Sequence, residues 1–316
     1  MNDHTLRRLA AAARGVVIMG LAAVAFVGCA KKEAAAPAAA EPAKPVAPTR
    51  EQLLAANVAG VFEAPVTLAA GRYEGPPAQP GAASKPMLTL WESTIEFVDL
   101  DGAPPEEGVA ILTSSGGGSG TFTHLGIFNV QDGKAGTLGV APIGDRVQVF
   151  RLWHEPGKVL LDVVEPGPND PACCPTQVSR KSFGWKDGKL QALTSEAVGG
   201  LSINLLAATD WMLVEMDGQP LAKGAMPPTT LIQYGKAAGF AGCNRYTGPI
   251  TESSPGAIKL GELAVTRKAC DGPASEIEAA FLERMRGATS YSFQAGRLLL
   301  VAPQGGQQPR TLLFSR

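Results

Sequence analysis

The sequence predicts a mainly β (α+β) protein, with two small antiparallel β domains that follow a signal peptide and a disordered tether. Short runs of β-branched and aromatic residues recur along the chain, separated by turn residues that include many of its 37 Gly and 25 Pro. Only residues 275–286 stand out as an amphipathic helix. We expect a signal peptide at 1–28, a tether at 29–50 and β domains at 51–200 and 208–316.

The first 28 residues have the layout of an export signal. Three arginines precede an apolar or small run of 13 residues, Gly15–Val27. A membrane-spanning helix needs about 20 such residues, so the run is typical of a signal-peptide core. Gly28 and then Cys29 follow directly. An ordinary secretory signal in which Cys29 is incidental is the alternative interpretation.

This arrangement resembles a bacterial lipoprotein signal, which implies cleavage before Cys29 and lipidation of its sulfur. The membrane is then one partner of the protein, since two or more acyl chains give stable anchoring. In such lipoproteins Asp after the cysteine often marks inner-membrane retention, so Ala30 favours the outer membrane, facing the periplasm. Residues 30–50 hold nine Ala and four Pro, which predicts an extended spacer.

Charge and cysteine content restrict the partners and the compartment. The chain carries 28 basic and 29 acidic residues without a basic stripe, so we do not expect nucleic-acid binding. Export predicts an oxidising environment. Cys243 and Cys270 are the favoured disulfide pair, with two buried free thiols as the alternative. The adjacent Cys173 and Cys174 are a second candidate pair, with a rigid turn between prolines as the alternative.

Turn motifs organise the region 51–200. Val147–Trp153 and Val159–Val164 flank Glu155-Pro156-Gly157-Lys158, and Pro followed by Gly favours a tight turn. Ser182–Trp185 and Lys189–Leu193 flank Lys186-Asp187-Gly188 in the same way. We therefore predict two hairpins here.

Strands and one helix are predicted for the second region. The expected strands are 211–216, 229–234, 237–241, 258–265, 291–293, 297–301 and 311–314. In the helix at 275–286, Ser275 and Glu278 have the spacing of a capping box. Ile277, Phe281 and Met285 share one face, and Gly287 ends the helix.

Both regions resemble known families. Trp211, the run Gly239-Phe240-Ala241-Gly242-Cys243-Asn244-Arg245-Tyr246-Thr247-Gly248 and the run Leu263–Cys270 resemble the META domain (HslJ-like). That resemblance implies a curved antiparallel sheet with one helix and a role in envelope stress or maintenance, and it supplies no catalytic residues. Gly167–Thr176, among other stretches, resembles a domain of uncharacterised bacterial lipoproteins.

No catalytic, cofactor-binding or metal site is predicted. His124 and His154 lie in expected strands without a nucleophile motif nearby. The glycine-rich residues 116–120 lack the Lys and the following helix of a phosphate-binding loop. Acidic residues offer oxygen ligands for calcium without the spacing of a calcium loop; these are Asp99, Asp101, Glu106 and Glu107.

These features favour a membrane-anchored envelope lipoprotein that binds an envelope protein, a glycan or a misfolded client without catalysis. The alternatives are an envelope hydrolase, which requires titratable groups gathered in a cleft, and a small-ligand carrier or inhibitor, which requires an apolar interior pocket.

Overall fold

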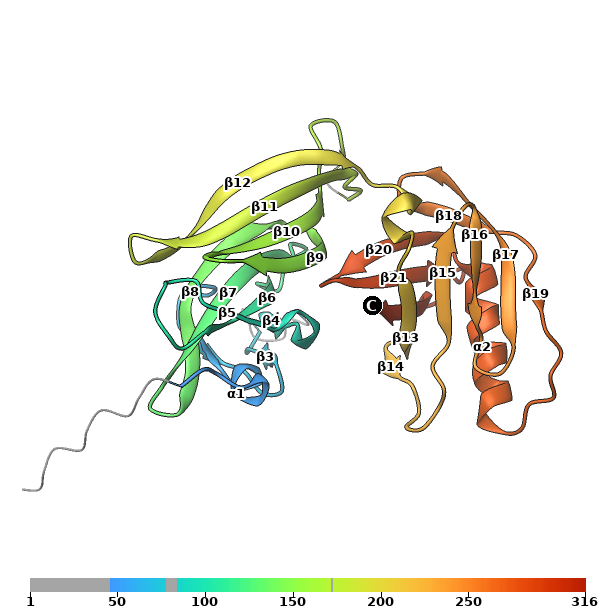
Figure 1. Cartoon of the computed structure of the whole chain (residues 1–316), viewed down its shortest axis with the longest axis horizontal. Helices are drawn as coiled ribbons and strands as arrows, with labels where there is room; N and C mark the ends of the chain where they lie inside the picture. The colour runs from blue at the N-terminus through green and yellow to red at the C-terminus, as the bar shows by residue number, and fades with distance from the viewer. Residues whose placement is uncertain (1–45, 78–83, 172) are drawn as a thin grey trace, which may run out of the picture. The chain divides into compact units, whose positions relative to one another are not determined.

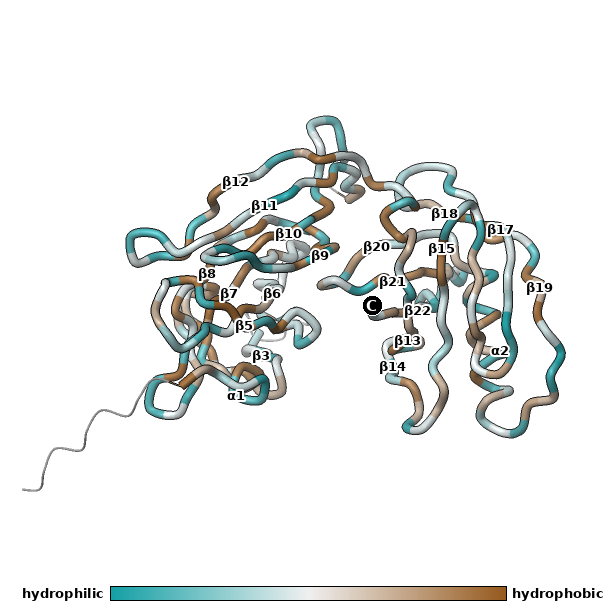
Figure 2. Tube along the Cα trace, in the orientation of Figure 1, coloured by the Kyte–Doolittle hydropathy of each residue, from teal (hydrophilic) through white to brown (hydrophobic). Residues whose placement is uncertain are grey.

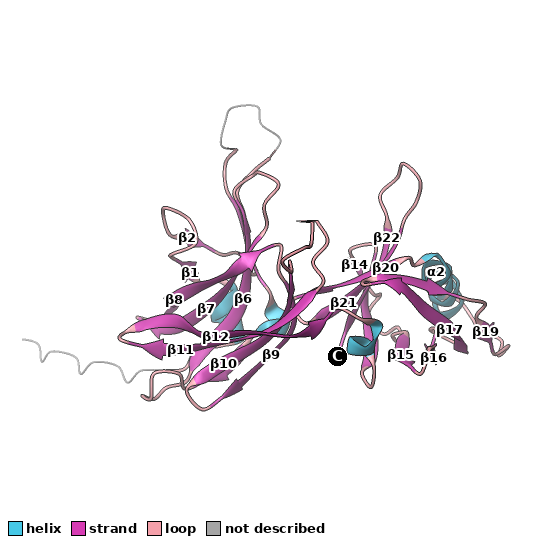
Figure 3. Cartoon of the chain, turned by 90° about the horizontal axis from the view of Figure 1, so that it is seen from above, coloured by secondary structure: helices cyan, strands magenta, loops and turns pink. Residues whose placement is uncertain are grey.

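The computed structural model describes residues 46–77, 84–171 and 173–316 (Figure 1). Strands dominate the described residues (Figure 3), which confirms the predicted mainly β class. Pro48 is buried and α1 begins at Arg50, so the folded part starts just before the expected boundary at residue 51. No helix in the described residues is long and apolar enough to span a membrane.

An eight-stranded sheet occupies the first part of the chain, in the order β2-β1-β8-β7-β6-β4-β3, with β5 paired to β6. Its strands are β1 (Asn57–Val58), β2 (Val66–Thr67), β3 (Arg72–Glu74), β4 (Met87–Leu90), β5 (Glu96–Val98), β6 (Glu107–Ser115), β7 (Phe122–Gln131) and β8 (Lys134–Asp145). The short helices α1 (Arg50–Leu54) and η1 (Glu92–Thr94) accompany it.

Strand β6 is buried from Glu107 to Leu112 because both of its faces carry a core. Successive side chains of a strand point to opposite faces. Val109 and Ile111 pack in one hydrophobic cluster, and Ala110 and Leu112 pack in another. The sequence of such a strand is a continuous apolar run instead of an alternation of apolar and polar residues.

The second sheet is a meander in the order β12-β11-β10-β9. Its strands are β9 (Gln148–Glu155), β10 (Lys158–Glu165), β11 (Gln177–Lys186) and β12 (Lys189–Gly200). Both predicted hairpins are confirmed, since Lys158 pairs with Glu155 and Lys186 pairs with Lys189. Figure 2 shows hydrophilic residues at the turn between β11 and β12. Val159, Leu161 and Val163 of β10 share a core with β6, β7 and β8.

A ten-stranded sheet forms the last part of the chain, and it closes on itself because β13 pairs with both β15 and β22. Its strands are β13 (Asp210–Met216), β14 (Gln219–Pro220), β15 (Thr229–Gln233), β16 (Lys236–Phe240), β17 (Arg245–Ser254), β18 (Ala257–Leu260), β19 (Ala264–Val265), β20 (Ser290–Gln294), β21 (Arg297–Ala302) and β22 (Arg310–Ser315). The turn η2 (Ile203–Leu206) precedes it.

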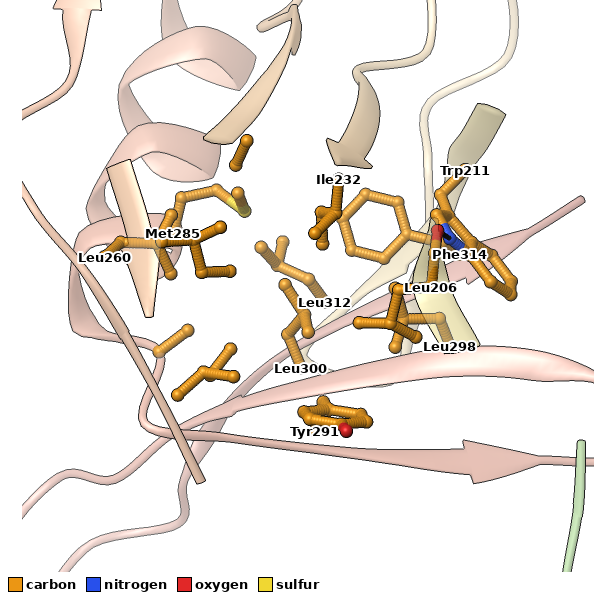
Figure 4. Packing of buried hydrophobic residues seen from close by; sticks show 14 of the residues in the cluster. Leu206, Trp211, Ile232, Leu260, Met285, Tyr291, Leu298, Leu300, Leu312 and Phe314 are labelled. Carbon is orange, nitrogen blue, oxygen red and sulfur yellow. Dashed lines mark hydrogen bonds between the residues drawn. The ribbon is translucent and has the colours of Figure 1, made fainter. Parts of the chain in front are cut away.

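Helix α2 (Pro273–Gly287) covers the core of this closed sheet. Phe281 and Met285 are fully buried among strand residues that include Trp211 and Phe314 (Figure 4). The predicted apolar face is therefore confirmed. Burying an aromatic or Met side chain contributes about 1.5–3 kcal/mol, so this face holds the helix in place.

Two sequence predictions in this region are wrong in detail, and one strand was missed. The helix begins at Pro273, so its N-cap is Gly272, which has no side chain to form a cap, and Glu278 accepts hydrogen bonds from Asn244 instead. The expected strand 258–265 is two strands, β18 and β19, which pair with different parts of β17. Strand β17 itself was not predicted, because it contains Gly248 and Pro249, and glycine and proline are uncommon inside strands.

Close backbone approach explains two glycines of the motif at 239–248. A Cβ on Gly239 would lie 2.1 Å from the Thr229 carbonyl oxygen, and one on Gly248 would lie 2.7 Å from the Glu262 carbonyl oxygen. No side chain fits at those distances, so both positions require glycine for packing.

Candidate functional site

The predicted lipidation site, Cys29, lies outside the described residues, as do the signal peptide and most of the tether. The four remaining cysteines are described. The structure joins Cys243 to Cys270, with Cα atoms 6.1 Å apart, and joins Cys173 to its neighbour Cys174. The Cys243–Cys270 bond ties the start of β17 to the segment before α2.

Replacing both Cys243 and Cys270 by Ser is expected to lower the free energy of unfolding by about 3.5 kcal/mol. The bond closes a loop with a sequence separation of 27 residues, and the chain-entropy model gives that magnitude. Chemical denaturation of the oxidised protein and of the double variant measures the difference. Equal denaturation midpoints and equal slopes of the free energy of unfolding against denaturant for the two proteins would show that the bond does not restrict the unfolded chain.

The acidic loop gathers three carboxylates, and Glu107, not Glu106, is the third. Ligand oxygens of Asp99, Asp101 and Glu107 lie within 4.8 Å of one another. Asp99 and Asp101 accept hydrogen bonds from the amides of Gly102 and Ala103 at 2.7 and 2.8 Å. Glu107 is buried and accepts from the Leu100 amide at 2.8 Å, and burial raises its pKa. The loop's own amides therefore occupy these oxygens in part.

The structure gives His124 a partner that the sequence did not reveal. Its Nε2 lies 2.9 Å from the Oγ of Ser114 on the neighbouring strand β6, and burial lowers the pKa of His124. No carboxylate in the described residues forms a hydrogen bond with its ring. Ser114 is buried. His154 is exposed near the end of β9, far along the chain from this pair.

A cavity of about 300 Å³, here called the seam cavity, lies where β9 and the β20–β21 hairpin meet. The Gly296 amide donates to the Val149 carbonyl at 2.9 Å, and the Phe293 amide donates to the Gln148 Oε1 at 2.9 Å. The rings of Phe150 and Phe293 lie 4.6 Å apart between centroids. These contacts hold the hairpin against β9, so the cavity has walls from segments distant in sequence.

The lining of the seam cavity combines aromatic surface with neutral polar groups. It consists of Trp91, Ile111, Thr113, Thr121, Thr123, Arg146, Val147, Gln148, Val149, Cys173, Pro175, Phe293, Gln294 and Ala295. The Trp91 indole donates to Thr113 Oγ1 at 3.0 Å, which fixes its orientation. Cys173 brings the Cys173–Cys174 disulfide to the wall.

Charge in the seam cavity is balanced. Arg146 donates to the Asp145 carboxylate from Nε and Nη2 at 3.1 and 2.7 Å. That bidentate pair lowers the pKa of Asp145 and keeps it ionised. Among the residues that line the cavity, Arg146 is the one titratable side chain, since Cys173 is disulfide-bonded. The arrangement can donate and accept hydrogen bonds but offers no group suited to proton transfer near neutral pH.

Ser114 and His124 stand apart from this cavity. Thr113 lines the cavity, and Ser114 is the next residue of β6, so its side chain points to the opposite face. Cys173 was singled out from the sequence, whereas Trp91, Gln148 and Phe293 were not. No local pattern marks those three, because each is an ordinary strand or turn residue until the fold brings them together.

Comparison with known proteins identifies the C-terminal part of the chain. Residues 204–315 match the META domain family. A solved structure titled "NMR structure of the protein from Burkholderia xenovorans" is 32% identical, over 36% of this chain and 84% of that one, with a TM-score of 0.30. Another, "NMR structure of the protein", is 22% identical over 36% and 94%, with a TM-score of 0.31. No curated protein matches the chain.

Proposed function

We propose that this chain, whose residues 204–315 form a META domain, is a lipid-anchored envelope protein that binds a hydroxyl-rich ligand, a glycan, in the seam cavity without transforming it. The sequence supports the anchor through the short apolar run that ends at Cys29. The seam cavity supports the ligand class. Of the partners expected from the sequence, a glycan fits that lining best.

The observation that carries this proposal is the pairing of aromatic surface with uncharged donors and acceptors. Thr113, Thr121, Gln148 and Gln294 line the same cavity as Trp91 and supply hydroxyls and side-chain amides. Sugars present apolar C–H faces and many neutral hydroxyls, and a pocket for them needs both kinds of surface. Because Asp145 neutralises Arg146, an uncharged ligand meets no unbalanced charge.

The anchor is tested by fractionating cells that express the full chain or its Cys29→Ala variant. We expect the wild-type protein in the membrane fraction and essentially all of the variant in the soluble fraction, because removal of the thiol removes the acyl chains. Mass spectrometry of the mature N-terminus is the direct measurement. An unmodified sulfur on Cys29 would refute the anchor and leave the cavity proposal standing.

The ligand is tested by titrating the protein without residues 1–29, which keeps Lys44–Arg316 whole, with a soluble N-acetylhexosamine oligosaccharide. Gln294→Ala with Thr121→Ala is expected to weaken binding by about tenfold, since each neutral hydrogen bond contributes about 0.5–1.5 kcal/mol. Gln308→Ala is the matched control, because Gln308 is exposed outside the cavity. Unchanged oligosaccharide after prolonged incubation is also expected. Hydrolysis of it would favour the enzyme class instead.

A further inference from the structure

A second cavity, of about 210 Å³, is surrounded by arginines that come from three different strands and turns. Arg151 belongs to β9, Arg297 begins β21 and Arg316 follows β22. These three residues are called the arginine site. Glu96 is the carboxylate in the lining, and Ser93 and Ser315 add hydroxyls. The site adjoins the seam cavity and shares Ala295 with it, but its arginines take no part in the function proposed above.

Arg297 is held rigidly and is incompletely paired. Its guanidinium lies 5.1 Å from the centre of the Trp91 ring, and its Nη1 lies 3.4 Å from Glu215 Oε1, which is a long ion pair. Its Nε is buried and has no hydrogen-bond partner. Burial lowers the pKa of Arg297 in spite of Glu215, which means that the cation lacks full compensation. A buried donor without a partner is costly, and a ligand acceptor would relieve that cost.

Arg316 and Arg151 line the same cavity beside it. Arg316 donates from Nη2 to the Phe150 carbonyl at 3.0 Å and lies 4.8 Å from the centre of the Phe150 ring. Burial and the like charge of Arg151 lower the pKa of Arg316. Arg151 stacks 4.9 Å from the Trp153 ring centre. In the described part of the chain, Glu215 is the one carboxylate that forms an ion pair with any of these three arginines.

The aromatic rings hold these side chains in place before any ligand arrives. Arginine loses conformational freedom when it binds an anion, and stacking on Trp91, Phe150 and Trp153 has already restricted that freedom. The three guanidinium groups share the cavity with Glu96, while Glu215 pairs with Arg297 and the charge of Asp162 acts on Arg316. Guanidinium groups match the geometry of phosphate oxygens better than ammonium groups do.

We propose that the arginine site binds a phosphate group, either as free phosphate or as the headgroup of an anionic phospholipid. The phosphate oxygens would accept hydrogen bonds from Arg297, Arg316 and Arg151, and the hydroxyl of Ser315 would donate at the rim, whereas the Ser93 hydroxyl donates to the Ala295 carbonyl.

The experiment uses the chain without residues 1–29 and two probes. Inorganic phosphate is titrated by calorimetry, and sedimentation measures binding to vesicles of phosphatidylcholine with and without phosphatidylglycerol. Arg297→Gln and Arg151→Gln are each expected to weaken binding at least tenfold, because each removes charged hydrogen bonds. Added salt should weaken it as well. Arg267→Gln is the control, since Arg267 is exposed and outside the cavity.

The probes separate the two sources of phosphate. Binding of inorganic phosphate that both variants reduce supports a site for the free anion. Binding to the phosphatidylglycerol vesicles alone, again reduced by both variants, supports the lipid headgroup. Arg151 is exposed, so its variant stays informative if Arg297→Gln fails to fold. Absence of binding to either probe would overturn the proposal, and so would binding that Arg151→Gln leaves at the wild-type level.

Discussion

Replacing Asp217 by Asn is expected to lower the free energy of unfolding by about 3 kcal/mol, because the change leaves the buried guanidinium of Arg284 without its carboxylate partner. Arg284, in α2, has a side chain only 8% exposed and donates to Asp217 from Nη2 and Nε at 2.5 and 3.2 Å. Arg310 and the Thr311 amide also donate to this carboxylate, at 2.8 and 2.9 Å. A neutral amide cannot satisfy these donors or their charge.

The turn itself supplies a matched control. Asp217 and Asp187 both precede a glycine in a hairpin turn and both have a positive φ, 51° and 52°. Asn tolerates that conformation as well as Asp does. Asp187 is exposed and forms no ion pair with another described residue. Asp187→Asn should therefore change stability by less than about 0.5 kcal/mol. Equal effects of the two variants in urea denaturation would contradict the account.

The Asp217 effect also depends on pH in a defined direction. Its partners, first of all Arg284, hold the pKa of Asp217 below the usual Asp range. A carboxyl group whose folded-state pKa is depressed stabilises the fold above its unfolded pKa of about 3.9, and this contribution is lost as the pH falls further. The stability difference between wild type and Asp217→Asn should be constant at neutral pH and shrink below about pH 4.

Replacing Asn244 by Ala is expected to cost about 3 kcal/mol, because Asn244 connects three segments of the META domain. Its Oδ1 accepts from Thr266 Oγ1 and the Lys268 amide at 2.8 and 2.7 Å. Its Nδ2 donates to the Lys268 carbonyl and to Glu278 Oε1, both at 3.1 Å. Asn244 is only 4% exposed, so water cannot readily replace these bonds.

A double-mutant cycle with Glu278→Ala checks this network. Both single variants break the hydrogen bond from Asn244 Nδ2 to Glu278 Oε1, so their combined cost should fall short of the sum of the single costs by at least about 0.5 kcal/mol. Asn204→Ala, at an exposed position in η2, is the control and should have little effect. Strict additivity of Asn244→Ala and Glu278→Ala would mean that the two side chains do not act together.

Predictions from local sequence patterns were correct where all the residues of the pattern lie close together in the chain. The hairpin around Pro156-Gly157 and the apolar face of α2 follow from φ preferences and periodicity alone. The predicted capping box of α2 failed because the helix begins at Pro273, which puts Ser275 inside its first turn. Glu278 accepts instead from the Asn244 amide, 34 residues away in the chain, which a local rule does not reach.

The sequence by itself determined the mainly β class, the hairpins, the META domain in the last third of the chain and the expectation of an anchor at Cys29. Tertiary structure alone decided the seam cavity and the arginine site. Trp91, Gln148 and Phe293 lie in three separate segments, as do Arg151, Arg297 and Arg316. Periodicity and turn preferences act over a few residues, whereas a cavity depends on which strands, distant from one another in sequence, form its walls.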